Sequence, residues 1–156
     1  MSTENIEFDP IDHKIAEILM EDASLTSSQL GELIGLSPSA ANERVRKLKN
    51  EGAIKKTVAL VDSDFMNMRL GAFIFVLVEG KENNANFLKN AYAHKNIIEI
   101  HHMTGEYSYI LKIRCESTKA LEILITDFLK GQVGVTKTMT QIILSSYKEK
   151  SLIIAS

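Results

Sequence analysis

The chain has 156 residues, of which 45% are hydrophobic, and its 18 lysines and arginines stand against 20 aspartates and glutamates. These fractions lie near the averages of globular proteins and exclude a disordered chain. The net charge of −2 excludes a protein that holds nucleic acid by bulk positive charge alone.

Neither the apolar runs nor the cysteine content points to a membrane or to an oxidising compartment. A long apolar run, residues 72–78, is far shorter than the ~20 residues of a membrane-spanning helix. The acidic N-terminus has no apolar segment typical of a secretion signal. The single cysteine, Cys115, suits a reducing compartment. We therefore expect a soluble, cytoplasmic protein, with Cys115 as a core thiol.

Charge is distributed unevenly along the chain. Residues 1–35 carry eight acidic side chains and one basic one, whereas residues 36–60 carry six basic and two acidic ones. A compact basic segment beside an acidic one can face a polyanion while the whole protein stays near neutral. The alternative interpretation is a solvated helix face.

Three helices are predicted in the first third of the chain. Asp9, Thr26 and Ser37 each precede apolar residues at helical spacing, and each side chain can accept a hydrogen bond from a first helical turn. The predicted helices cover residues 10–20, 26–35 and 38–52. The second and third are joined by a tight turn at Gly35, as in a helix-turn-helix unit.

The third predicted helix has the pattern of a recognition helix. Ala41, Val45 and Leu48 form its buried stripe. Such a helix fits the major groove, where an asparagine can pair with adenine and an arginine with guanine or phosphate. The outer face carries Ser39, Asn42, Glu43, Arg46 and Lys47.

Residues 53–60 alternate loosely and predict a strand or wing. Its two lysines would contact the phosphate backbone without specifying sequence. The alternative is a three-helix module that contacts another protein, whose binding would depend far less on salt. The predicted DNA-binding residues are Ser37, Ser39, Asn42, Glu43, Arg44, Arg46, Lys47, Lys55 and Lys56.

An ordered set of short motifs resembles the Lrp/AsnC (leucine-responsive, feast/famine) transcription regulators. In the first half they are Asp12-His13-Lys14-Ile15, Gly35-Leu36-Ser37-Pro38-Ser39, Glu43-Arg44-Val45-Arg46-Lys47-Leu48 and Glu51-Gly52-Ala53-Ile54. In the second half they are Leu70-Gly71-Ala72-Phe73, residues 103–112 and residues 134–140. The resemblance spans nearly the whole chain and implies a sequence-specific, DNA-binding transcription regulator.

The second half of the chain predicts an α+β unit. Strands are expected over residues 70–79, 97–104, 107–115 and 135–147, with helical spacing around residues 87–92 and after Ser117. This order, βαββαβ, is the ferredoxin-like arrangement. The first strand is apolar on both faces, so a sheet from a second subunit is expected to cover the face without helices.

The predicted organisation has three parts. We expect a winged helix-turn-helix domain over residues 1–61, a linker over 62–69, and a ferredoxin-like effector-binding and oligomerisation domain over 70–156. The resemblance implies face-to-face homodimers and an octamer of four dimers.

The resemblance also implies a small effector, commonly an amino acid, bound between dimers near the turn that joins the second and third strands. The family's usual turn reads Gly-Asp-aromatic-Asp. Here Glu106 retains the first carboxylate, whereas Ser108 removes the second. Either an amino acid is still bound, or the effector is changed or lost. The matching residues are Met103, Thr104, Gly105, Glu106, Tyr107, Ser108, Thr138 and Thr140.

Other kinds of site have weaker support. Glu99 and His101 share one face of a predicted strand, which is too few ligands for a closed metal site. The chain has no Gly-rich phosphate loop, zinc spacing or nucleophile elbow. We expect no metal, no cofactor other than an effector, and no enzyme activity. A small ferredoxin-like dimeric enzyme is the rival from another class.

Overall fold

The computed structural model describes residues 7–148. Up to Tyr147 the chain divides into two compact units, one that runs to Ala59 and one that spans Leu60–Tyr147. Within the described residues, every helix is too short or too polar to cross a bilayer.

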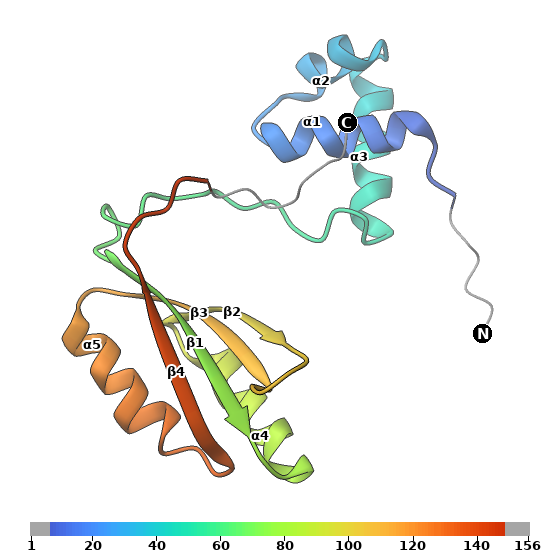
Figure 1. Ribbon diagram of the computed structural model, residues 1–156. Helices are drawn as coiled ribbons and strands as arrows, with labels where there is room; N and C mark the ends of the chain where they lie inside the picture. Colours follow the sequence, from blue (N-terminus) through green and yellow to red (C-terminus); the bar gives the residue numbers. More distant parts are fainter. Residues whose placement is uncertain (1–6, 149–156) are drawn as a thin grey trace. The chain divides into compact units, whose positions relative to one another are not determined.

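Three helices form the first unit: α1 (Pro10–Glu21), α2 (Ser27–Ile34) and α3 (Pro38–Asn50), drawn in Figure 1. The predicted caps are confirmed, because Asp9, Thr26 and Ser37 each accept a hydrogen bond from the third backbone N–H of their helix. The three helices close on a small core of Ile15, Leu30, Ala41 and Leu48.

Two glycines allow the tight turn between α2 and α3. A Cβ atom at Gly31 would lie 2.5 Å from the backbone oxygen of Leu36, so a larger residue would push the turn away from α2. Gly35 ends α2 with a φ of 72°, a left-handed conformation that favours glycine. Gly31 therefore permits close packing of the turn against α2.

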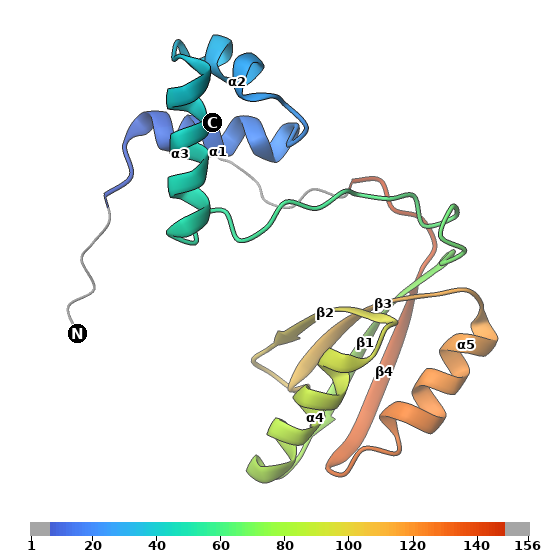
Figure 2. The same cartoon turned by 180° about the vertical axis from the view of Figure 1, so that it is seen from behind.

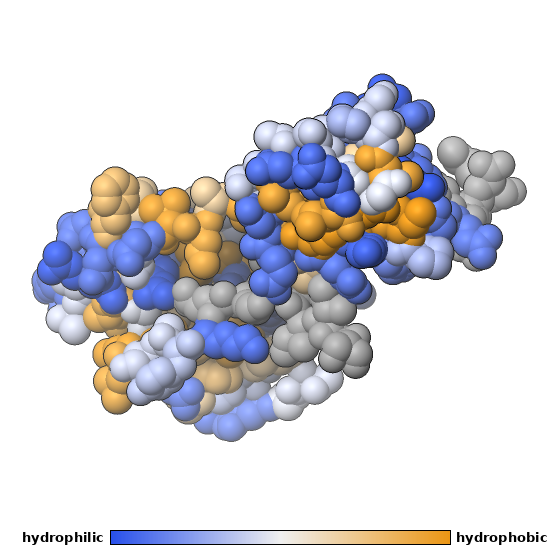
Figure 3. Space-filling model, turned by 90° about the horizontal axis from the view of Figure 1, so that it is seen from above, coloured by the Kyte–Doolittle hydropathy of each residue, from blue (hydrophilic) through white to orange (hydrophobic). Residues whose placement is uncertain are grey.

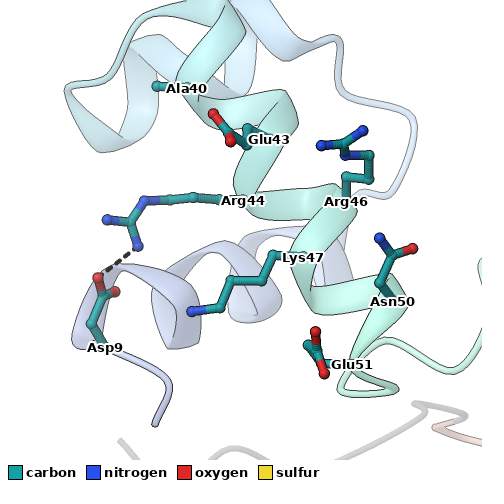
Figure 4. Close-up of a pocket in the computed structure, with 8 residues that line it drawn as sticks. All are labelled: Asp9, Ala40, Glu43, Arg44, Arg46, Lys47, Asn50 and Glu51. Atoms are coloured by element: carbon teal, nitrogen blue, oxygen red, sulfur yellow. Dashed lines mark hydrogen bonds and ion pairs between the residues drawn. The ribbon is translucent and has the colours of Figure 1, made fainter. Parts of the chain in front are cut away.

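A buried carboxylate joins α1 to α3. The side chain of Asp12 is fully buried, and its Oδ1 accepts a 2.8 Å hydrogen bond from Nη1 of Arg44. The same Nη1 donates to Oδ2 of Asp9 at 2.6 Å, as Figure 4 shows, and Lys47 Nζ lies 3.4 Å from Asp12 Oδ2. We call Asp9, Asp12, Arg44 and Lys47 the Asp12 network. It sets the rotation of α3 against α1, because a buried charge must keep its partners.

The strand predicted over residues 53–60 is absent from the described part of the chain. Ile54 packs on the helical core, but residues 55–60 are exposed and run without regular secondary structure. A strand requires a neighbouring strand for its backbone hydrogen bonds, and no described segment pairs with this one.

The second unit is a four-stranded antiparallel sheet with strand order β2-β3-β1-β4. Its elements are β1 (Leu70–Val78), α4 (Lys81–Ala93), β2 (Ile97–His102), β3 (Tyr109–Cys115), α5 (Thr118–Ile123), a π-helical continuation η1 (Leu124–Leu129) and β4 (Val135–Ile143). This arrangement confirms the ferredoxin-like βαββαβ prediction. Figures 1 and 2 show α4 and α5 on the same face of the sheet.

Only the helix-covered face of the sheet is fully buried. On β1, Ala72, Ile74 and Val76 are buried against helix residues such as Phe87. Alternate β1 residues on the other face are only half-buried within one subunit, and this is the apolar face that a second subunit is expected to cover. The reason is that the helices form a single layer. Cys115 is fully buried on the helix face, as predicted, and burial raises the pKa of its thiol.

The strand ends differ from the predicted ones. The second strand ends at His102, the third begins at Tyr109 and the last ends at Ile143. The loop between β2 and β3 is longer than predicted, and at its end the N–H of Ser108 donates to the Val76 oxygen of β1 at 3.0 Å, outside the regular pairing of Val76 with Tyr109. The helix after Ser117 widens where the Thr126 hydroxyl donates to the Glu122 oxygen at 2.8 Å and competes for that carbonyl.

Replacing Asp12 tests the role of the buried carboxylate. Asp12→Ala should lower the free energy of unfolding of the first unit by about 2 kcal/mol, because the cations of Arg44 and Lys47 lose their buried partner. Hydrogen exchange at the backbone amides of α1 and α3 measures this. As a control, Asp64→Ala should cost less than about 0.5 kcal/mol, since its exposed carboxylate lies 4.0 Å from Arg69. Equal effects of the two variants would contradict the assignment.

The same network predicts an acid dependence. Burial alone would raise the pKa of Asp12, but hydrogen bonds from Arg44 and from the Asp9 backbone outweigh burial and hold this pKa below its ordinary value. A lowered pKa in the folded state stabilises the fold above the unfolded pKa of about 3.9, and this stability is lost as pH falls through the folded value. The difference in free energy of unfolding between wild type and Asp12→Ala should therefore be largest at neutral pH and decrease below about pH 4.

Candidate functional site

The outer face of α3 carries the polar residues predicted to meet DNA. Ser39, Asn42, Glu43, Arg46 and Lys47 are all exposed. A shallow pocket of about 500 Å³ runs along this helix, and Figure 4 shows its lining side chains. Because Ala41 and Leu48 point into the core, the polar face is turned to solvent.

The polar side chains of α3 differ in whether they already have partners. Arg44 and Lys47 belong to the Asp12 network, with 30% and 44% of their side chains exposed. Asn42, Glu43 and Arg46 make no side-chain hydrogen bond or ion pair with any described residue. The structure thus separates residues that hold α3 in place from residues free to contact a ligand.

The remaining predicted DNA-binding residues lie at the two ends of α3. Ser37 caps its N-terminus, where its Oγ accepts a 3.2 Å hydrogen bond from the Ala40 N–H. Lys55 and Lys56 follow the C-terminal end of α3 in the exposed irregular segment. Basic side chains beside a recognition helix can contact phosphates from either strand conformation or loop conformation.

The predicted effector turn, residues 103–108, lies at one end of the sheet. Its N–H at Met103 donates to the Ser108 oxygen at 2.9 Å, which closes the turn. The Ser108 hydroxyl lies 3.3 Å from the Val78 nitrogen and 3.4 Å from the Val78 oxygen. Thr104, Gly105 and Glu106 are exposed, and a side chain at Gly105 would meet open space.

Lys137 is a residue of this region that the sequence analysis did not single out. Its ammonium pairs with the Glu106 carboxylate and lies 5.4 Å above the ring of Tyr107. The ion pair raises the pKa of Lys137. The contact depends on strand register, because β4 places Lys137 opposite Leu77 of β1, and sequence alone does not reveal that pairing.

Thr138 and Thr140 lie on a different face of the sheet from Lys137. They pair with Val76 and Ile74, whose side chains are buried beneath the helices. Thr140 borders an apolar groove of about 390 Å³ between α5 and β4, with Leu121 and Ile125 on its helical side. Within one subunit, the predicted effector residues therefore form two groups.

Glu99 and His101 both lie on β2, where Nε2 of His101 is 3.2 Å from Oε2 of Glu99. The Glu99 carboxylate also accepts a 3.1 Å hydrogen bond from Lys112. Burial alone would raise the pKa of Glu99, but the hydrogen bonds with His101 and Lys112 outweigh burial and hold this pKa below its ordinary value. Among residues 7–148, no three possible metal ligands cluster together.

Two family models match the chain. A winged helix-turn-helix DNA-binding model matches residues 8–55, and the Lrp/AsnC ligand binding domain matches residues 71–153. The HTH-type transcriptional regulator FL11 of Pyrococcus horikoshii is 33% identical over 145 residues, which cover 92% of this chain and 94% of FL11.

Solved structures agree with these matches. The transcriptional regulator NMB0573 of Neisseria meningitidis, in complex with L-Met, superposes with a TM-score of 0.90 at 26% identity and covers 95% of this chain and 97% of its own. The AsnC structure of E. coli has a TM-score of 0.83 at 25% identity and covers 94% of this chain and 98% of its own.

These similarities confirm the resemblance drawn from the sequence motifs. They favour a DNA-binding regulator over a module that contacts another protein. The relatives are transcription regulators with a helix-turn-helix domain, which points away from an enzyme. The folded α3 face and the antiparallel sheet match the two domains of such regulators. The chain belongs to the Lrp/AsnC family of transcription regulators.

Proposed function

We propose that a homodimer presents two α3 helices to a pseudo-palindromic operator, with half-sites about 34–36 Å apart or a multiple of that distance. The observation that carries the proposal is the exposed α3 face, on which Asn42, Glu43 and Arg46 have no partner among the described residues. Side chains of these types are the ones that read base edges in the major groove.

The other predicted residues would hold the protein on the DNA backbone. Ser37 and Ser39 lie at the N-terminus of α3, where N–H groups favour a phosphate. Lys55 and Lys56 are exposed cations beyond the other end of the helix. Lys47 remains 44% exposed and can reach a phosphate from the Asp12 network, whereas we assign Arg44 chiefly to positioning α3.

Substituting these cations tests the DNA interface. Arg46→Ala should weaken operator binding about tenfold or more and relax one base preference, because a side chain that reads a base is lost. Lys55→Ala and Lys56→Ala should weaken binding to all sequences alike, each reducing the salt slope by about 1. Fluorescence anisotropy over a salt series measures both. If Arg46→Ala leaves specific binding unchanged, α3 is not the reading helix.

We further propose that an amino acid modulates this regulator by binding near residues 103–108, between dimers. The match to a ligand binding domain and the L-Met complex of a structural relative support an amino-acid effector. Glu106, whose carboxylate pairs with Lys137 within the subunit, is the acidic group that would bind the ammonium of an amino acid in exchange for Lys137, and the open space at Gly105 permits close approach to the backbone. Thr138 and Thr140 lie on the other sheet face, so we propose that they are contributed by a different subunit from the turn.

Removing the Glu106 charge tests this site. Glu106→Gln should weaken the amino-acid response about tenfold, because a hydrogen bond to a charged group is lost. The measurement is the shift in melting temperature across a panel of amino acids. Glu116→Gln, an exposed carboxylate at the other end of β3, is the matched control and should respond like wild type. Identical shifts in both variants would exclude Glu106 from the site.

Assembly is proposed to occur through the sheet face that carries no helices. Phe73, Phe75 and Leu77 are half-buried there, and Met139 is 38% exposed. Burying such apolar surface is worth about 25 cal/mol per Å², so a second sheet packed against it stabilises a dimer. Four dimers would then form the octamer. In Figure 3, apolar residues gather in patches among hydrophilic ones on the visible face.

A charge placed on this face should dissociate the dimer. Phe75→Asp should shift the protein to monomers, because a carboxylate buried between two sheets has no partner. Sedimentation equilibrium measures the state, and circular dichroism verifies folding. Leu33→Asp is the control, because Leu33 is a 55% exposed apolar residue of α2, in the other unit of the chain. A folded Phe75→Asp dimer would place the interface elsewhere.

A further inference from the structure

Glu43 stands out on α3 because it is a carboxylate on the face that carries the basic and amide side chains. Its cationic neighbours on the helix are Arg46 and Lys47, three and four residues further along, and Lys47 belongs to the Asp12 network. Glu43 is exposed and makes no side-chain hydrogen bond or ion pair with the described residues, Arg46 included. Its carboxylate is therefore not held by a cation within the described part of the chain.

An unpaired carboxylate at this place opposes DNA binding in general. Each phosphate repels it, and the repulsion strengthens when water is removed between the helix and the groove. The cost is offset only where the DNA offers the carboxylate a hydrogen-bond donor. An unpaired carboxylate in a DNA interface would therefore weaken binding to most sequences and spare those with a donor at one position.

The hydrogen-bonding groups that the bases present in the major groove favour one base, cytosine, as the partner of a carboxylate. A carboxylate can only accept hydrogen bonds. Guanine presents the acceptors N7 and O6, thymine presents the acceptor O4 and a methyl group, and adenine presents the acceptor N7 beside its N6 donor. Cytosine presents the N4 donor with no acceptor of its own at that edge. A carboxylate therefore meets the least repulsion at cytosine.

The position of Glu43 on the helix fits direct contact with a base. It lies in the N-terminal half of α3, which begins at Pro38, and it follows Asn42 directly. Arg46 lies nearly one turn further along the same exposed side, and Figure 4 shows Glu43 among the side chains that line the α3 pocket. Residues in this half of a recognition helix are those that reach base edges.

We propose that Glu43 determines operator specificity by accepting a hydrogen bond from N4 of a cytosine in each half-site. This inference rests on the proposed function of α3 as the reading helix. It assigns Glu43 the selection of one base pair, cytosine opposite guanine, at a position adjacent to the one read by Asn42.

The test is selection of duplexes from a randomised DNA library by the full-length protein, followed by affinity measurements on the selected motif. Wild type should enrich cytosine at one position of each half-site. Glu43→Gln should lose this preference by about tenfold or more and shift it toward adenine, because an amide can pair with adenine N6 and N7. Binding of this variant to unselected DNA should rise severalfold, since a repelled charge is gone.

Glu51→Gln is the matched control. It removes the same charge from an exposed carboxylate that follows the last residue of α3. This variant should select the wild-type motif, cytosine included. If Glu43→Gln also selects the wild-type motif, the proposal is overturned and Glu43 is a solvated side chain. If wild type itself selects no motif, the proposed function of α3 fails, and that result is separate from any effect of Glu43.

Discussion

The orientation of the α3 face that we propose to read DNA depends on one buried charge, the carboxylate of Asp12. Asp12 is fully buried between α1 and α3, where Arg44 and Lys47 neutralise it. Because a buried carboxylate without partners is costly, α3 is held in one rotation against α1. That rotation turns Ala41 and Leu48 into the core and Asn42, Glu43 and Arg46 to solvent. The basic residues of α3 therefore differ in their contacts, because Arg44 and Lys47 are bound to Asp12 and Arg46 is not. Their charges alone do not show this difference.

The second unit is organised by a different constraint, the single layer of helices on its sheet. One face of β1 is fully buried and the other is only half-covered, although the strand is apolar throughout. An apolar strand with one open face requires a second layer. The same geometry divides the candidate effector residues, because Glu106 pairs with Lys137 on the open face while Thr138 and Thr140 lie on the helix face. The proposed assembly and the proposed effector site therefore use the same sheet.

The parts of the fold that were predicted correctly are those with local causes. Caps at Asp9, Thr26 and Ser37 form within four residues, and the alternation along residues 109–115 reports one buried face. The predictions were wrong where contacts between distant segments determine the secondary structure. The third strand starts at Tyr109, where regular pairing with Val76 of β1 begins, and residues 53–60 form no strand because no described neighbour pairs with them. Hydrogen bonds between distant segments leave no periodic trace in the sequence.

The order of elements, the helix-turn-helix unit, the ferredoxin-like order and the family resemblance can all be predicted from the sequence, because spacing, caps and turn residues act over short distances. Which charged side chains have partners among the described residues depends on how the elements pack. The tertiary structure joined Arg44 to Asp12 and left Glu43 without a partner among the described residues. It also brought Lys137 to Glu106, 31 positions apart in sequence. The physical reason is that charges pair through space, and residues far apart in the chain meet only when the helices and strands have packed.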